Sequence, residues 1–212
     1  MKKDKGNTEE ATVKKIMIAT PCHDGKLPVE YVGALLDTMR AGIPAIIAPV
    51  FLPRESMLPH ARNYLAQLFL DSDFDVLMYI DADMVWSPEQ FARIALSEAP
   101  VMSAVAHLKI ENSPFNFREL PKEKASKEGI LSVESVGAAF IKLDRHVVVT
   151  AVKDSDKYTV HDGEYPSLFE YSIVNGELIG EDIGFCRKIR RRKTQVLVDL
   201  SVVVGHIGSK IY

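Results

Sequence analysis

The chain has 212 residues and a mass of 23.6 kDa, enough for one large domain or two small ones that bury about 70% of their extended surface. Apolar residues make up 47% and charged residues 26% of the sequence, a composition that excludes collagen, disordered tails and coiled coils. The 26 Lys and Arg against 29 Asp and Glu leave a net charge of -3, so no global positive field attracts nucleic acid or anionic lipid, and any phosphate must be bound locally.

The first 13 residues are charged and contain no apolar segment, so we expect a flexible tail and not a secretory signal. No stretch approaches the ~18 apolar residues of a membrane span, which predicts a soluble protein without a transmembrane segment. Cys22 and Cys186 lie far apart and in no metal-binding pattern, which is typical of the reducing cytoplasm. The sequence stops a few residues after His206, a candidate functional residue, so further domains of a longer protein are one expectation.

Apolar runs of strand length alternate along the chain with segments of helical period. Strands are predicted at 15–20, 45–51, 75–80, 101–106, 137–143 and 194–200, and helices at 29–39, 61–69, from 88 onward and at 181–192. Gly42 and Pro44 end the first helix, and the Ser87 hydroxyl can cap the third, with Pro88 at its first position. This alternation predicts a single α/β domain, with a mostly parallel sheet and helices on both faces.

Two long segments, 109–128 and 152–166, lose this periodicity and are rich in polar residues and proline. Loops of that length inside a compact domain are uncommon unless they form lids or binding loops. We therefore expect both segments to be loops close to a ligand.

The strongest local signal is Asp81-Ala82-Asp83, which follows the buried-type run VLMYI. Residues two apart on an extended segment point the same way, and ligands of open α/β sheets bind outside the carboxyl ends of the strands. Two carboxylates facing one site suit Mg²⁺ or Mn²⁺, which complete their shells with water and phosphate oxygens. The alternative is that the aspartates only cap the loop before Ser87.

Further short motifs accompany this one in a set order. They are Thr20-Pro21-Cys22 at the end of the first strand, Ala61-Arg62-Asn63 on a helix, Gly180-Glu181-Asp182 opening a helix that carries Phe185-Cys186-Arg187, and Val204-Gly205-His206-Ile207-Gly208 after the last strand. The ordered set, from Lys15 to Gly208, resembles the GT-A fold of nucleotide-sugar glycosyltransferases of the family 2 type, and its compact length resembles phage and large-virus members.

The resemblance implies a hexosyltransferase-like enzyme of glycan biosynthesis. It implies metal-dependent transfer of a sugar from a nucleoside diphosphate, most readily UDP, to a hydroxyl of a glycan, protein or lipid-linked acceptor, with inversion and with no nucleic-acid partner. Residues 14–212 then form the GT-A domain, in which 14–100 bind the nucleotide and 101–212 carry the acceptor and metal half.

The metal assignment follows the same resemblance. Asp83 is implied to bind the divalent cation that bridges the donor phosphates, and Asp81 to contact the ribose or the metal through water. His206 matches the third metal ligand, and an imidazole favours Mn²⁺ over Mg²⁺. A cation there neutralises the charge that develops on the leaving nucleoside diphosphate.

The implied donor-binding residues lie on four segments. They are Thr20, Pro21, Cys22 and Asp24 for the base and ribose, Arg62 and Asn63 on the helix, Ala82 between the aspartates, and Gly137 and Ala138, small residues that let the donor sugar approach the backbone. Cys22 is equally consistent with a small buried residue, and Arg62 with an ordinary salt bridge.

Asp182 matches the general base of inverting members, which takes the proton of the acceptor hydroxyl, and Glu181 is the fallback for that role. Acids are also favoured at helix N-termini by the backbone dipole, so simple capping is the alternative. Trp86, the one tryptophan, follows Asp83 and is not near Gly137, so the sequence assigns no stacking partner for the acceptor.

Two other functions stay open. A haloacid-dehalogenase-type phosphohydrolase would phosphorylate Asp81 and use Asp83 as the acid, although that motif normally lies on the first strand and here follows two strand-helix units. A non-catalytic nucleotide-sugar-binding module would keep Asp83 and His206 without needing Asp182.

Overall fold

The computed structural model describes residues 13–110, 113–160, 163–208 and 211, so almost all of the predicted tail of residues 1–13 lies outside the described residues. The helices are α1 (Val29–Arg40), α2 (Leu58–Leu70), α3 (Pro88–Ala95), α4 (Arg145–Lys153) and α5 (Glu181–Arg191). The strands of the main sheet are β1 (Lys14–Cys22), β2 (Ala45–Pro53), β3 (Val76–Ile80), β4 (Met84–Val85), β5 (Val101–Ala106), β6 (Phe117–Glu119), β7 (Ile130–Val136), β8 (Phe140–Asp144) and β13 (Val196–His206).

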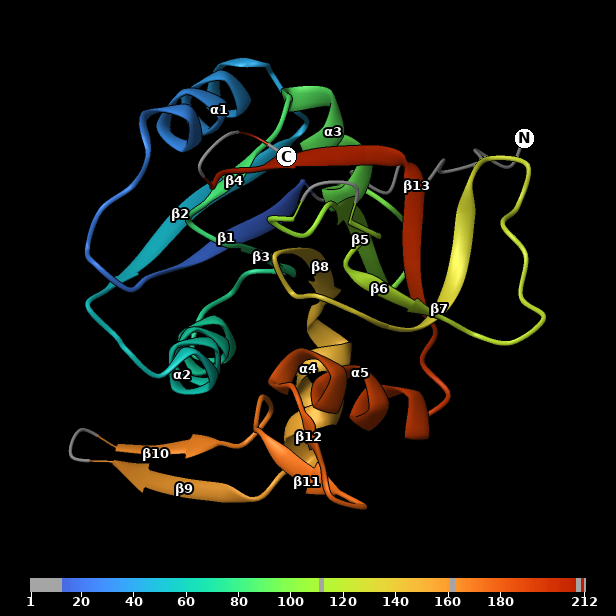
Figure 1. The fold of residues 1–212 in the computed structure, drawn as a ribbon. Helices are drawn as coiled ribbons and strands as arrows, with labels where there is room; N and C mark the ends of the chain where they lie inside the picture. The colour runs from blue at the N-terminus through green and yellow to red at the C-terminus, as the bar shows by residue number, and fades with distance from the viewer. Residues whose placement is uncertain (1–12, 111–112, 161–162, 209–210, 212) are drawn as a thin grey trace, which may run out of the picture.

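The main sheet has the strand order β2-β1-β3-β8-β5-β13-β7-β6, and β4 pairs with the end of β13 (Figure 1). β1 runs parallel to β2 and β3, and β5 runs parallel to β13, while β8 and β7 run antiparallel to their neighbours. Two hairpins stand outside this sheet: β9 (Lys157–Val160) with β10 (Gly163–Pro166), and β11 (Ser172–Val174) with β12 (Glu177–Ile179).

Helices cover both faces of the sheet because the strands alternate their side chains between two cores. In β1, Ile16 and Ile18 pack toward α1 and α3, whereas Met17 and Ala19 pack toward α2, α4 and α5. Figure 1 shows α1 and α3 on one side of the sheet and the other helices on the opposite side. The predicted α/β domain with a mostly parallel sheet and helices on both faces is therefore confirmed.

Several local predictions are confirmed, and others are wrong. Ser87 caps α3 in a capping box, since its hydroxyl accepts a hydrogen bond from the Gln90 amide and the Gln90 side chain accepts one from the Ser87 amide. The strand predicted at 137–143 begins only at Phe140, because residues 137–139 form the turn between β7 and β8. The segments predicted as loops contain β6 and the β9–β10 hairpin, and α4 was not predicted at all.

No helix of the described residues is long and apolar enough to cross a membrane. Cys22 and Cys186 are both buried and unpaired.

Lys142 of β8 is a fully buried cation that holds the loop between α3 and β5. Its ammonium donates to the carbonyls of Ser97 (3.0 Å) and Ala99 (2.6 Å) and lies 2.7 Å from Asp144 Oδ1. Burial lowers its pKa, and the ion pair with Asp144 opposes that shift.

We expect Lys142→Met to lower the free energy of unfolding by about 3 kcal/mol, because it leaves buried acceptors and a carboxylate unpaired while keeping the aliphatic stem. Urea unfolding measures this change. The exposed pair Lys157–Glu164 provides the control, since Lys157→Met should change stability by less than ~0.5 kcal/mol. Equal effects of the two substitutions would contradict a specific role for Lys142.

Candidate active site

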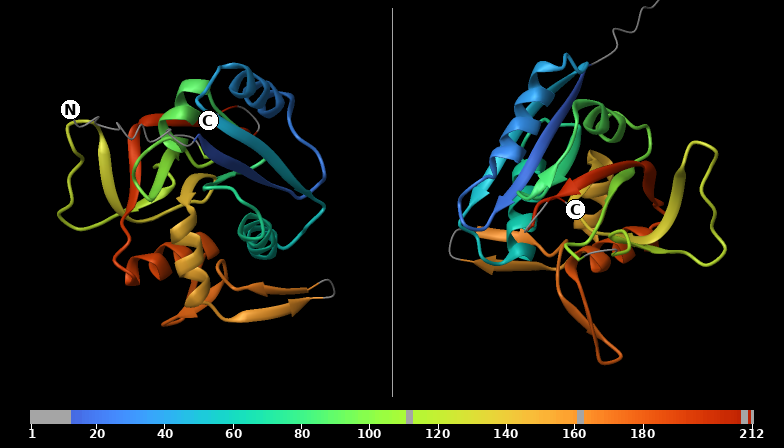
Figure 2. Two further views of the ribbon diagram at one scale, coloured as in Figure 1. Left: turned by 180° about the vertical axis from the view of Figure 1, so that it is seen from behind. Right: turned by 45° about the horizontal axis from the view of Figure 1, so that its top comes forward.

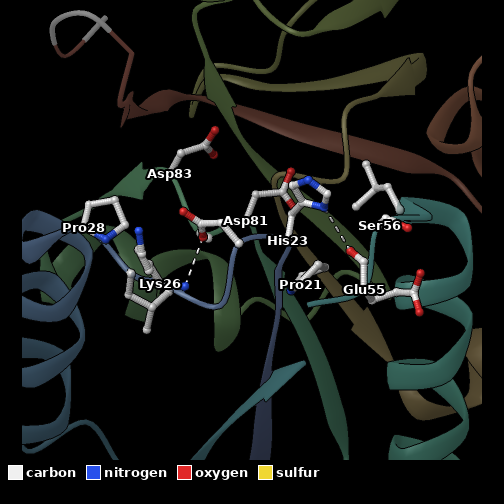
Figure 3. Close-up of a pocket in the computed structure, with 12 residues that line it drawn as sticks. Pro21, His23, Lys26, Pro28, Glu55, Ser56, Asp81 and Asp83 are labelled. Atoms are coloured by element: carbon white, nitrogen blue, oxygen red, sulfur yellow. Dashed lines mark hydrogen bonds between the residues drawn. The ribbon is translucent and has the colours of Figure 1, made fainter. Parts of the chain in front are cut away.

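A pocket of about 780 Å³ opens where the carboxyl ends of β1, β2 and β3 meet. Its walls come from the loop after β1, the segment between β2 and α2, and the turn after β3 (Figure 3). The lining residues are Pro21, His23, Asp24, Lys26, Leu27, Pro28, Glu55, Ser56, Leu58, Asp81, Ala82 and Asp83. This is the edge of the sheet at which open α/β folds bind ligands.

Backbone hydrogen bonds fix the turn that carries Asp81, Ala82 and Asp83. The Asp81 amide donates to the Ala139 carbonyl (2.9 Å), and the Asp83 carbonyl accepts from the Ile207 amide (2.7 Å). The turn is thus held between the β7–β8 connection and the end of β13. Both aspartates are partly exposed, so their carboxylates stay accessible.

Asp83 and His206 lie together although they are far apart in sequence. His206 Nε2 is 3.5 Å from Asp83 Oδ2, and His206 Nδ1 is 2.9 Å from the carbonyl oxygen of His107. Gly205 allows this approach, because a Cβ there would lie 2.9 Å from Ile211 Cγ2 and 3.4 Å from Val85 Cβ. The motif therefore needs its glycine for packing of β13 against β4.

Asp83 also forms an ion pair with Lys109, which follows β5. Burial alone would raise the pKa of Asp83, but hydrogen bonds from His206 and Lys109 outweigh burial and lower it to about 2. The same contact with Asp83 raises the pKa of His206. The Asp83 carboxylate is thus stabilised in its ionised form by contacts with His206 and Lys109.

Asp81 is engaged differently, because a buried arginine of α2 binds it. Arg62, 2% exposed, donates from Nη2 to both Asp81 oxygens at 3.0 Å and forms a second ion pair with Glu181. Burial opposes the charge on Arg62, but Asp81 and Glu181 outweigh burial and raise its pKa. Among the described residues, Arg62 Nε has no hydrogen-bond partner. Arg62 therefore ties the end of β3 to the start of α5.

Asp182 projects from the first turn of α5 toward the β7–β8 connection. Its Oδ1 accepts a hydrogen bond from the Ile183 amide (2.7 Å). A Cβ on Gly137 would lie 3.5 Å from Asp182 Oδ2 and 3.1 Å from Asn116 Nδ2. The absence of a side chain at Gly137 thus leaves room beside the second carboxylate oxygen.

The structure brings only some of the predicted residues to the pocket. Pro21, Asp24, Asp81, Ala82 and Asp83 line it. The other predicted residues do not line the pocket. His206 contacts Asp83, Glu181 contacts Arg62, and Gly137 adjoins Asp182. The remaining ones are buried: Thr20, Cys22, Arg62, Asn63 and Ala138.

The side chains of Thr20 and Asn63 are used by neighbouring structure. Thr20 Oγ1 shares a hydrogen bond with the Tyr31 hydroxyl (2.6 Å), and the Asn63 amide pairs with the backbone of Phe169 at 2.8 and 2.9 Å. This geometry therefore does not support the donor contacts expected of Thr20 and Asn63. The Cys22 thiol donates a hydrogen bond to the Thr20 carbonyl and is likewise a buried packing group.

Sequence reasoning missed Lys26, Glu55, Ser56, Lys109 and Asn116. The first three line the pocket from loops that the sequence left without motifs, and the latter two fall in the aperiodic segment from 109. That loss of periodicity pointed to a functional loop but not to individual residues.

Among the described residues, no group of three or more His, Cys, Asp or Glu side chains is arranged to hold a metal ion. Asp83 and His206 form a pair, whereas Asp81, the third residue predicted for the metal site, has both carboxylate oxygens hydrogen-bonded to Arg62.

No protein-family model matches the sequence, and no curated protein matches it. Solved structures do match. The viral protein A197 from STIV is 16% identical, with a TM-score of 0.59 over 92% of this chain and 86% of its own. GalNAc-T7, crystallised with UDP, GalNAc and Mn²⁺, is 13% identical, with a TM-score of 0.54 over 94% of this chain and 45% of its own. TarS 1-349 from S. aureus, in complex with UDP-GlcNAc, is 12% identical, with a TM-score of 0.49 over 88% and 56%.

The likenesses to A197 and GalNAc-T7 show a shared fold, that of GT-A glycosyltransferases such as GalNAc-T7. The chain spans about half the length of the GalNAc-T7 and TarS chains.

Proposed function

We propose that the protein is a metal-dependent glycosyltransferase that moves a sugar from a nucleoside diphosphate, UDP in the first instance, to a hydroxyl acceptor with inversion. The observation that carries the proposal is the convergence of Asp83 and His206 at the mouth of the strand-end pocket, with Asp182 on the neighbouring helix. The fold shared with GalNAc-T7, which binds UDP and Mn²⁺, supports it.

The residues present fit a divalent cation. The bond between His206 Nδ1 and the His107 carbonyl leaves Nε2 as the ring nitrogen that faces Asp83, the orientation usual for a metal-ligating histidine. One carboxylate and one imidazole suit Mn²⁺, or Mg²⁺ with more water, since these ions take their remaining ligands from water and substrate phosphates. Asp83 and His206 would hold the ion, which neutralises charge on the leaving diphosphate.

The loops around the pocket would bind the nucleotide. His23 Nδ1 lies 3.4 Å from the Glu55 carbonyl oxygen, and the Asp24 carboxylate accepts from the Lys26 amide at 3.0 Å (Figure 3). These contacts fix the two loops that face each other across the pocket. Pro21, Asp24 and Ser56 would then line the space for base and ribose.

Asp182 would act as the general base. Its Oδ1 is held by the Ile183 amide, so Oδ2, which adjoins Gly137, accepts the proton of the acceptor hydroxyl. As that proton leaves, the acceptor oxygen attacks the anomeric carbon on the face opposite the diphosphate, and the bond from that carbon to the diphosphate oxygen breaks. Glu181 is a weaker candidate because its side chain is 9% exposed and its carboxylate is bound to Arg62.

Lys109 would compete with the metal ion, because its ammonium contacts the carboxylate that binds the cation. We expect Lys109→Gln to tighten the binding of Mn²⁺ alone by up to about fivefold, because an ion pair this exposed contributes at most ~1 kcal/mol of competition. Titration with Mn²⁺ in the absence of nucleotide measures this. Lys26→Gln, a loop lysine that lines the same pocket, is the control, and weaker Mn²⁺ binding by Lys109→Gln would contradict competition.

A direct assay of the proposed reaction is the release of UDP from a panel of UDP-sugars, with and without Mn²⁺. Metal-dependent release of UDP from at least one UDP-sugar is expected, and binding of UDP-sugars without any release would favour the non-catalytic module.

The phosphohydrolase alternative is disfavoured because both oxygens of Asp81, its nucleophile, accept hydrogen bonds from Arg62. The acceptor class, glycan, protein or lipid-linked, and the cytoplasmic location stay predictions.

A further inference from the structure

A second pocket, of about 630 Å³, lies beside the one assigned to the nucleotide. The two pockets share Ser56 and Leu58 at the start of α2. The second pocket is lined by Ser56, Met57, Leu58, Pro59, His60, Asn63, Tyr158, Val160, Ser167, Phe169, Glu170 and Tyr171. The start of α2 therefore separates the two pockets.

The far wall of this pocket packs against α5, the helix that carries the proposed general base. Phe169 stacks on Phe185 of α5 with ring centroids 4.5 Å apart, and a Cβ on Gly184 of α5 would lie 3.3 Å from the Glu170 carbonyl oxygen. Tyr171 belongs to the segment that connects Phe169 to α5. Phe169 lies under the Arg62 guanidinium, 5.8 Å from ring centroid to Cζ. A ligand in the second pocket thus lies between the nucleotide pocket and the start of α5.

The lining is aromatic and carries no positive charge. The His60 ring packs edge-on against the Tyr158 ring, with centroids 5.8 Å apart, and its Nδ1 lies 2.8 Å from the Tyr158 hydroxyl. Among the described lining residues there is no lysine or arginine, and Glu170 is the charged member. The cations behind these walls are already paired, Lys188 with Glu170 and Arg62 with Asp81 and Glu181. Such walls suit a neutral, hydroxyl-bearing ligand, because a phosphate or carboxylate would meet no unpaired lysine or arginine among the described lining residues.

An apolar strip continues from this pocket onto the β11–β12 hairpin. Tyr171, Ile173 and Leu178 are 56%, 76% and 71% exposed. Ile173 and Leu178 are cross-strand partners, and Tyr171 lies two residues before Ile173, so all three side chains share one face. Val174 points to the opposite face and is 46% exposed.

A tight turn closes the hairpin, and this face is exposed among the described residues. Asn175 and Gly176 have φ values of 52° and 83°, as a tight type I′ turn requires. Figure 2, right, shows the hairpin extending away from the body of the protein. Contiguous exposed apolar side chains commonly mark a binding surface.

On the basis of the proposed function, we propose that the second pocket and this strip together bind the acceptor: an uncharged hydroxyl-bearing head group in the pocket, and an apolar portion attached to it along Tyr171, Ile173 and Leu178. The strip is continuous with the pocket through Tyr171, and the pocket wall packs on α5, the helix that begins with Glu181 and Asp182. The acceptor is therefore a neutral amphiphile, and a charged or wholly polar saccharide would use half of the surface.

Alkyl β-glucosides of increasing chain length, from methyl to octyl and kept below their micelle concentrations, are suitable probes. Their binding is measured by saturation-transfer NMR titration without any donor. For the wild-type protein we expect affinity to rise by about twofold per added methylene, as partial burial on an open strip implies. The double variant Ile173→Ser/Leu178→Ser should abolish this dependence while methyl glucoside binds as before.

Val174→Ser, on the opposite face of the same hairpin, should retain the full dependence on chain length. Affinity independent of chain length, or equal loss in the Val174 variant, would overturn the proposal. Two other assays would also overturn the proposal. If the wild-type protein pelleted with neutral phosphatidylcholine vesicles, or formed a dimer in sedimentation, and the double variant did not, the strip would bind a membrane or a second copy of the chain.

A UDP titration of the same samples tests the proposed function separately. Loss of the chain-length dependence with UDP binding retained would contradict the acceptor proposal alone, whereas absent UDP binding would contradict the proposed function.

Discussion

Asp182→Asn is expected to reduce sugar transfer by about 10³-fold while UDP affinity stays within about twofold of wild type. General-base catalysis contributes ~10²–10⁴-fold to such reactions, and an amide cannot accept the proton of the acceptor hydroxyl. The substitution keeps the size of the side chain and the hydrogen bond from the Ile183 amide to Oδ1. Donor binding is preserved because Asp182 does not line the nucleotide pocket.

The comparison with Glu181→Gln makes this assignment specific. Glu181 forms a buried ion pair with Arg62, so its substitution should lower stability as well as activity. If Glu181→Gln removed transfer without loss of stability and Asp182→Asn left transfer intact, the base would be Glu181. Rates of UDP release and thermal unfolding of both variants decide between the two carboxylates.

Arg62→Met should be the most destabilising single change at the site, lowering the free energy of unfolding by about 3–5 kcal/mol. It leaves the carboxylates of Asp81 and Glu181 close together without the cation that separates them, in surroundings that solvate them poorly. Their repulsion would push the start of α5 away from β3, and Asp182 would move with it. Transfer should therefore fall even where the variant is still folded.

The double variant Arg62→Met/Glu181→Leu tests this explanation. Removing the second charge should recover at least half of the lost stability, because one buried carboxylate then no longer requires a partner. Denaturant unfolding of wild type, the two single variants and the double variant gives the coupling energy. Additive effects would contradict the view that Arg62 acts by bridging the two carboxylates.

The main elements of the fold were predictable because each one carries a strong local signal. The alternation of apolar runs with segments of helical period predicted β1, β2, β3, β5 and α1 to α3 to within a few residues. The helix at Arg145–Lys153 was missed, since its run of Val147, Val148 and Val149 has no polar residue to reveal a helical period. Short strands such as β6 depend on pairing with distant β7 and leave no local pattern.

At the site, the sequence identified carboxylates but not their partners. Asp83 was expected to meet His206, and these side chains do lie together. Arg62 was expected to contact the donor, with a salt bridge as the alternative, and its guanidinium faces Asp81 and Glu181, because a buried cation must be neutralised by the nearest anions. Which anions those are depends on how α2 packs against α5, and motif spacing does not encode that packing.

The charge balance of the chain also has a structural counterpart. A net charge of -3 required that any phosphate be bound by local groups, and the cationic side chains at or beside the pocket include Lys26, Lys109 and the buried Arg62. Arg62 is paired with Asp81 and Glu181, and Lys109 is paired with Asp83. In the proposed reaction, a bound divalent cation would therefore supply much of the positive charge required at the diphosphate.

Calorimetric titration of UDP with and without Mn²⁺, on the wild type and on Asp83→Asn, tests the central claim most directly. The wild-type protein should bind UDP at least tenfold more tightly in the presence of Mn²⁺, and Asp83→Asn should lose that enhancement while unfolding at the same denaturant concentration. UDP binding that is absent, or that is independent of Mn²⁺ in the wild type and unchanged in Asp83→Asn, would contradict the assignment of Asp83 and His206 to a metal-dependent glycosyltransferase site.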